Sequence, residues 1–268
     1  MSLPLPPLLL VGCGRMGGAM LAAWYERGLA PSVVVDPAPR LPPGKIPVTV
    51  VPGAAGIPAG FAPAAIILAV KPQQAAAVLP HFTSFAGKSV FLSIMAGRTI
   101  TGMRAALGPS AAVVRAMPNT PAAIRAGTAV ACAGPGVDAD QRRLCDSLLA
   151  AVGQVAWVEE EALLDAVTAL SGSGPAYVFL LAELLERAGV EQGLPAGLAR
   201  LLARRTISGA GALLDASSED AAQLRAAVTS PGGTTEQALA VLMEERAWPE
   251  SVSRALAAAT ARSRALAG

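Results

Sequence analysis

The loop Val228-Thr-Ser-Pro-Gly-Gly-Thr-Thr-Glu236 is polar and glycine-rich, and its residues could bind a small anion. The hydroxyls of Ser230, Thr234 and Thr235 flank two consecutive glycines. Thr234, with Gln237 three positions later and an apolar run after it, predicts a capping box at a helix start. Free amides and the helix dipole at such an N-terminus favour a carboxylate. An ordinary capped loop would carry the same residues, so both interpretations stay open.

A second glycine motif, Gly12-Cys-Gly-Arg-Met-Gly17, directly follows the apolar run Leu8-Leu-Leu-Val11. An apolar run of this length is typical of a buried parallel strand, and a helix is expected from about residue 17 to 27. In this context Gly12 would make the tight turn, Gly14 would let the backbone approach a pyrophosphate, and Gly17 would allow close helix packing. The motif therefore predicts a dinucleotide site.

Asp36 ends the next expected strand, about twenty residues after the glycine motif Gly12–Gly17, which we call the fingerprint. A carboxylate there accepts hydrogen bonds from the adenosine ribose and favours NAD over NADP. Arg40 lies close enough along the chain to meet a 2′-phosphate instead. Asp36 before Pro37 is also typical of a strand-end turn. We therefore take Asp36 and Arg40 as cofactor-binding candidates and leave NADH and NADPH as alternatives.

Two further segments follow apolar strands, at the edge where open α/β sheets bind ligands. They are Val70-Lys-Pro72 and Ala96-Gly97. Lys71 is a candidate catalytic base, a phosphate contact or a solvated charge. A catalytic lysine needs burial or a charged neighbour to lower its pKa, and the sequence shows neither.

Strands and helices alternate as far as residue 158, and after Glu159-Glu-Glu161 only helical periodicity remains. This change predicts two domains: a Rossmann-like parallel-sheet domain over 1–160 and an all-helical domain over 161–268. The interruption Ser171-Gly-Ser-Gly-Pro175 fits either serine caps on the following helix or a loop beside the site. We favour the caps.

The 268 residues carry a net charge of +2 without a basic stripe, which disfavours nucleic-acid binding. Prolines and glycines interrupt the charge-free run 46–70, and the amino terminus lacks the basic region of a signal peptide. We therefore expect a cytoplasmic protein without a membrane partner. Three cysteines without metal-ligand spacing and a single histidine argue against a metal site. We interpret that histidine, His81, as an ordinary loop or helix-end residue.

Together these motifs resemble the pyrroline-5-carboxylate reductase family over nearly the whole chain. The segments that carry the resemblance are Gly12-x-Gly-x-Met-Gly17, Ala69-Val-Lys-Pro72, Val114-Arg-Ala-Met-Pro-Asn-Thr-Pro121, Asp165-Ala-Val-Thr-Ala-Leu-Ser-Gly-Ser-Gly-Pro-Ala-Tyr177 and Val228-Thr-Ser-Pro-Gly-Gly-Thr-Thr-Glu236. The resemblance implies NAD(P)H-dependent reduction of 1-pyrroline-5-carboxylate to L-proline, the last step of proline biosynthesis. It also implies a helical dimerisation domain and a homodimer, which several members assemble into decamers.

The resemblance also implies roles for individual residues. The cofactor would contact Gly12, Cys13, Gly14, Arg15, Met16, Gly17, Val70, Lys71, Pro72, Ala96, Gly97 and Asn119. The substrate would contact Glu161, Ser230, Gly232, Gly233, Thr234 and Thr235. Thr235 is the expected catalytic residue, because it would hydrogen-bond the ring nitrogen while the other loop residues hold the carboxylate.

The chain departs from the family at two places. Arg225-Ala226 stands where relatives often carry Lys-Asp, and Val51-Pro-Gly-Ala-Ala55 lacks the Asn that commonly meets the cofactor ribose. Two rival functions remain. A β-hydroxyacid dehydrogenase would need a lysine in the helical half, but the lysines are Lys45, Lys71 and Lys88. A catalytically silent NAD(P)-sensing module is the other, and the intact 230–235 loop argues against it.

Overall fold

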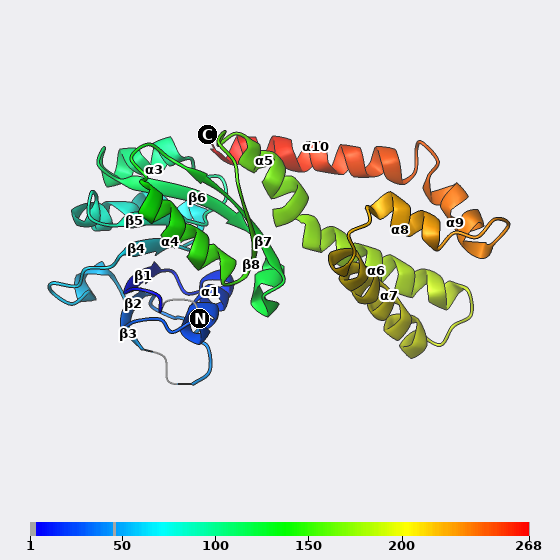
Figure 1. The fold of residues 1–268 in the computed structure, drawn as a ribbon, viewed down its shortest axis with the longest axis horizontal. Helices are drawn as coiled ribbons and strands as arrows, with labels where there is room; N and C mark the ends of the chain where they lie inside the picture. Colours follow the sequence, from blue (N-terminus) through cyan, green and yellow to red (C-terminus); the bar gives the residue numbers. More distant parts are fainter. Residues whose placement is uncertain (1–3, 45–46, 268) are drawn as a thin grey trace. The chain divides into compact units, whose positions relative to one another are not determined.

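The computed structural model describes residues 4–44 and 47–267 (Figure 1). Contacts between residues divide the chain into two compact units. The first comprises residues 1–172 and 259–268, and the second comprises residues 173–258. The chain therefore passes from the first unit to the second and returns at its carboxyl end.

One mixed sheet forms the centre of the first unit, with strand order β3-β2-β1-β4-β5-β6-β7-β8. Its strands are β1 (Leu8–Val11), β2 (Ser32–Val35), β3 (Val48–Val51), β4 (Ala65–Leu68), β5 (Val90–Ser93), β6 (Ala112–Pro118), β7 (Gly127–Ala133) and β8 (Gly153–Trp157). Strands β1 to β6 are parallel, whereas β7 pairs antiparallel with β6 and parallel with β8. Only the short 3₁₀ segment Thr120–Ile124 connects β6 to β7, too little chain for a parallel crossover.

Helices cover both faces of this sheet. They are α1 (Arg15–Glu26), α2 (Ala75–Val78), α3 (Ile100–Leu107), α4 (Ala139–Ala150) and α5 (Leu163–Val167), with the 3₁₀ helix η3 (Leu79–Phe85) after α2. On one face, Trp24 of α1 is fully buried and donates from Nε1 to the carbonyl of Leu148 in α4 at 2.9 Å. On the other face, Phe82 and Met103 pack against the sheet. These two layers confirm the Rossmann-like expectation.

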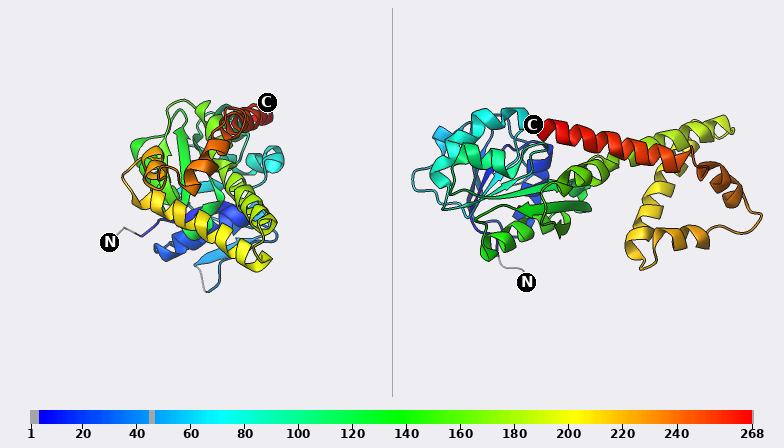
Figure 2. Two further views of the ribbon diagram at one scale, coloured as in Figure 1. Left: turned by 90° about the vertical axis from the view of Figure 1, so that its right-hand side faces the viewer. Right: turned by 90° about the horizontal axis from the view of Figure 1, so that it is seen from above.

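The described part of the second unit is helical, as the sequence predicts. Its helices are α6 (Gly174–Glu191), α7 (Ala196–Ala216), α8 (Ala221–Ala227), α9 (Thr234–Leu242) and the beginning of α10 (Trp248–Ala267). Helices α6 and α7 pack side by side (Figure 2). No residue of α6, α8 or α9 is buried within the described chain. These helices therefore have too few intrachain partners to form a core of their own.

Helix α10 ends in the first unit, where a buried hydrogen bond fixes it. The Ser263 hydroxyl donates to Oδ1 of Asp165 in α5 at 2.7 Å. Between α5 and α6 the chain forms a π-helix over Thr168–Gly172. Residues 163–172 therefore form a short α-helix followed by this wider turn.

Candidate active site

The fingerprint glycines have the geometry that a dinucleotide requires. Gly12 has φ +91°, and a Cβ there would lie 2.7 Å from the carbonyl of Ala69, the residue after β4. A Cβ on Gly17 would lie 2.4 Å from the Gly12 oxygen, so α1 packs directly on the turn. Nothing lies within 4 Å of a Cβ on Gly14, the N-cap of α1. This open space beside the α1 amides fits a pyrophosphate.

Asp36 reaches back to the fingerprint with both carboxylate oxygens bound. Oδ2 accepts from the Cys13 amide at 2.6 Å, and Oδ1 accepts from the Ala38 amide at 2.8 Å. Burial and the nearby Asp36 charge raise the pKa of the Cys13 thiol to about 11, so this thiol is protonated at neutral pH. The Asp36 carboxylate is thus held in one orientation at the end of β2.

Arg40 approaches the fingerprint through its backbone. Its amide donates to the Cys13 carbonyl at 2.7 Å, and its carbonyl lies 2.5 Å from where a Cβ on Gly18 would stand. The Arg40 side chain is exposed. The contact with a 2′-phosphate that the sequence suggests stays a prediction.

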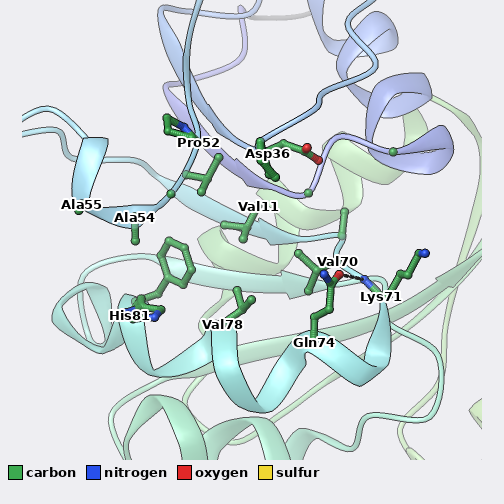
Figure 3. Close-up of a pocket in the computed structure, with 17 residues that line it drawn as sticks. Val11, Asp36, Pro52, Ala54, Ala55, Val70, Lys71, Gln74, Val78 and His81 are labelled. Carbon is green, nitrogen blue, oxygen red and sulfur yellow. Dashed lines mark hydrogen bonds between the residues drawn. The ribbon is translucent and has the colours of Figure 1, made fainter.

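A hollow of about 540 Å³ opens at the carboxyl ends of β1, β2 and β4 (Figure 3). It brings together five of the expected cofactor residues, which are Gly12, Gly14, Asp36, Val70 and Lys71. The expected residues that do not line it are Cys13, Arg15, Met16, Gly17, Arg40, Pro72, Ala96, Gly97 and Asn119. Its position, on the fingerprint side of the sheet edge, fits the adenosine half of a dinucleotide.

Sequence reasoning missed two polar residues of this hollow, Gln74 and His81. Oε1 of Gln74 accepts from the Lys71 amide at 3.3 Å, which closes the turn after β4. His81 lies one helical turn beyond Val78, which also lines the hollow. That helical spacing is the signal that could have identified His81. The Lys71 side chain is exposed, so nothing in its surroundings supports the catalytic alternative.

The loop after β5, which carries Ala96 and Gly97, is closely packed. Gly97 has φ +65°, and a Cβ there would lie 2.8 Å from the Leu266 Cβ in α10. Thr99 caps α3 by accepting from the Gly102 amide at 3.1 Å. The loop is therefore fixed at Gly97 by its packing on α10 and at Thr99 by the cap of α3. A fixed loop suits the predicted contact with the nicotinamide.

Glu161 lies in a buried polar cluster. Its Oε1 accepts from Nη1 of Arg115 at 2.9 Å and from the Ile100 amide, at the start of α3, at 2.8 Å. Arg115 is only 2% exposed, and its Nε and Nη2 have no hydrogen-bond partner among the described residues. Glu161 thus joins β6 to the loop after β5. The substrate contact implied by the resemblance stays a prediction for this residue.

Asn119 ties the end of β6 to two other segments. Its Nδ2 donates to the Ser171 hydroxyl at 3.2 Å, and its Oδ1 accepts from the Thr128 amide at 2.9 Å. Ser173 is the N-cap of α6 but makes no side-chain cap. The serine caps that the sequence allows are therefore not formed, and the Ser171 hydroxyl, within the π-helix, instead accepts from Asn119. Such π-helical turns frequently occur at functional sites.

The 230–235 segment leads into α9, which begins at Thr234, but the cap differs from the one that the sequence predicts. Gly233 is the N-cap and makes no side-chain cap, so the capping box of Thr234 with Gln237 is wrong. Instead the Gly232 amide donates to Oε2 of Glu236 at 2.8 Å, while Gly232 has φ +69°. Thr235 is half-buried in the first turn of α9, whose amides lack intrahelical partners.

The comparisons with known proteins agree with this geometry. The chain is 41% identical over 201 residues to the pyrroline-5-carboxylate reductase of Synechocystis, covering 75% of this chain and 74% of that relative. The chain belongs to the pyrroline-5-carboxylate reductase family. The family model for pyrroline-5-carboxylate reductase dimerisation matches residues 161–266. Membership confirms an NAD(P)-dependent oxidoreductase and disfavours the β-hydroxyacid dehydrogenase interpretation.

Two solved reductases of this family share the fold. The enzyme from Coxiella burnetii is 33% identical with a TM-score of 0.89, over 98% of this chain and 99% of that one. The enzyme from Plasmodium falciparum, solved with NADP bound, is 26% identical with a TM-score of 0.83 over the whole of both chains. Among the residues described here, no cluster of His, Cys, Asp and Glu side chains could hold a metal ion.

Proposed function

We propose that this chain reduces 1-pyrroline-5-carboxylate to L-proline with NAD(P)H. The observation that carries the proposal is the hollow beside Gly12, Gly14 and Asp36, in a chain 41% identical to a reductase of that name. The 230–235 loop supplies the small-anion site that a carboxylate substrate needs. This chain carries both the Gly12–Gly17 fingerprint and the 230–235 loop, which disfavours a catalytically silent cofactor sensor.

The residues present suit a reaction with little acid–base chemistry. A cyclic iminium is already electrophilic at carbon, and NAD(P)H supplies the hydride when bound. The Thr234 and Thr235 amides in the first turn of α9 and the hydroxyls of Ser230 and Thr234 would hold the carboxylate, while the Thr235 hydroxyl would orient the ring nitrogen. Positioning of this kind lowers a barrier without a strong acid or base. The chain therefore needs no catalytic histidine.

Turnover tests the proposal directly. Cofactor oxidation is followed at 340 nm with 1-pyrroline-5-carboxylate, in parallel with NADH and NADPH, and L-proline is identified as the product. Folded protein that oxidises neither cofactor would refute the proposed reaction. Cofactor oxidation without L-proline formation would also contradict the proposed reaction.

The fixed Asp36 carboxylate favours NADH. Its two backbone bonds prevent it from turning away from a 2′-phosphate, and a ribose hydroxyl could donate to it instead. Because a hydrogen bond to a charged group contributes about 1.5–3 kcal/mol, Asp36→Ser should shift the kcat/KM ratio towards NADPH by about tenfold or more. Asp140→Ser is the control, because Asp140 is exposed on α4 and contacts Arg143. An equal change of the kcat/KM ratio in both variants would mean that Asp36 is only a turn residue and does not select the cofactor.

A second copy of this chain is the proposed partner of α6 and α7. Exposed apolar side chains lie along both helices, including Val178, Phe179, Leu184, Leu185, Leu201 and Leu202. The helical stretch Leu163–Glu191 is long and apolar enough to cross a membrane by length and composition alone. However, this stretch carries Glu186, which pairs with Arg200 of α7 at 2.9 Å, and charged side chains are costly inside a membrane.

Sedimentation velocity at micromolar concentration tests this interface. A homodimer, or a decamer built from dimers, is the expected species. A stable monomer would contradict the proposal. We also propose that the enzyme acts in the cytoplasm, which localisation of a tagged chain tests.

A further inference from the structure

The end of the hollow farthest from the fingerprint forms a slot between two segments. The loop after β3 contributes Pro52 and Ala54 to one side, and α2 and η3 contribute Val78 and His81 to the other (Figure 3). Asp36, Lys71 and Gln74 lie towards the fingerprint end (Figure 3). Apart from the His81 imidazole, the side chains at the far end are apolar. A flat heteroaromatic group would fit this end better than a charged one.

His81 is free to contact a ligand. Its side chain is exposed, and no hydrogen bond or ion pair to a described residue holds the imidazole. It also borders a neighbouring hollow of about 510 Å³. The loop opposite, Pro52-Gly-Ala-Ala55, carries no side-chain hydrogen-bond donor. Side chains here must therefore recognise a base mainly by contact with its faces.

We propose that His81 stacks on the adenine of NAD(P)H and sets the affinity for the adenosine half of the cofactor. Aromatic side chains stack readily on nucleobases because every base presents a π-face. Val78 and Ala54 complete the apolar walls of the slot. The proposal rests on the cofactor use in the proposed function, but on no step of the reaction.

Direct binding tests this role. Isothermal titration gives the Kd of NADH, and of reduced nicotinamide mononucleotide, which lacks the adenosine. We expect His81→Ala to weaken NADH binding about five- to tenfold, at the lower end of measured stacking effects because the ring is exposed. His81→Phe keeps a stacking ring and should stay within about twofold of the wild type. Neither variant should change mononucleotide binding.

Ser84→Ala is the matched control. Ser84 lies on η3 and lines the neighbouring hollow, but not the cofactor hollow. An unchanged NADH Kd in His81→Ala would overturn the proposal, as would equal losses for NADH and the mononucleotide. Circular dichroism confirms that each variant is folded. Because substrate is absent, a failure to reduce 1-pyrroline-5-carboxylate would refute the proposed reaction, while these binding ratios still decide the role of His81.

Discussion

Replacing Glu161 by alanine is expected to lower the free energy of unfolding by about 3–5 kcal/mol. Arg115 is 2% exposed and would lose its carboxylate partner, which leaves a buried charge uncompensated. Its Nε and Nη2 already lack hydrogen-bond partners among the described residues, so little remains nearby to replace Glu161. The Ile100 amide at the start of α3 would lose its acceptor as well. Urea unfolding of the purified variant measures the change.

The control is Glu26→Ala, which breaks the ion pair between Glu26 and Arg125. That pair has a similar distance of 2.8 Å, but the Glu26 side chain is 65% exposed. Its loss should cost at most about 1 kcal/mol. The double variant Arg115→Met, Glu161→Leu should recover most of the lost stability, because apolar residues tolerate this burial. Equal losses of unfolding free energy in Glu161→Ala and Glu26→Ala would show that water solvates the Arg115 guanidinium.

Replacing Thr235 by alanine is expected to lower kcat about 10- to 100-fold, while the Kd of NADH stays unchanged. A hydrogen bond to the charged iminium nitrogen contributes about 1.5–3 kcal/mol, and each 1.36 kcal/mol of barrier is tenfold in rate. Steady-state kinetics with saturating cofactor and direct NADH titration measure the two quantities. Thr235→Ser keeps a hydroxyl and should recover most of the rate.

Thr229→Ala serves as its control within the same loop. The Thr229 hydroxyl donates to the Arg225 carbonyl at 2.7 Å and so completes the end of α8. This change should leave kcat near the wild-type value. A Thr235→Ala enzyme with unaltered kcat would remove Thr235 from the reaction and leave it as a first-turn residue of α9.

Local sequence was enough to predict the fingerprint. The turn at Gly12, the open side of Gly14 and the start of α1 depend on residues adjacent in the chain. The position of Asp36 could also be predicted. A helix and a strand of ordinary length after β1 bring the end of β2, and with it Asp36, beside the end of β1. Parallel strands then place β4, and with it Lys71, at the same edge.

Other features depend on competition between hydrogen-bond acceptors or on contacts between residues far apart in the sequence. Thr234 and Glu236 can both satisfy amides before α9, and only the backbone path, with Gly233 as the N-cap, decides between them. The contact between Arg115 and Glu161 joins distant parts of the chain, so no local pattern indicates it. His81 and the loop after β3 line the same hollow, and β3 lies at the sheet edge, outside β2. Sequence periodicity does not determine strand order.

The return of α10 to the first unit has a consequence for biosynthesis. Asp165 in α5 obtains its buried Ser263 partner from the last turns of the chain. Gly97 likewise meets Leu266. A ribosome therefore releases the whole helical segment before the residues that complete the amino-terminal unit emerge. The nascent chain must keep that unit without these two contacts until residues 263–266 have been synthesised.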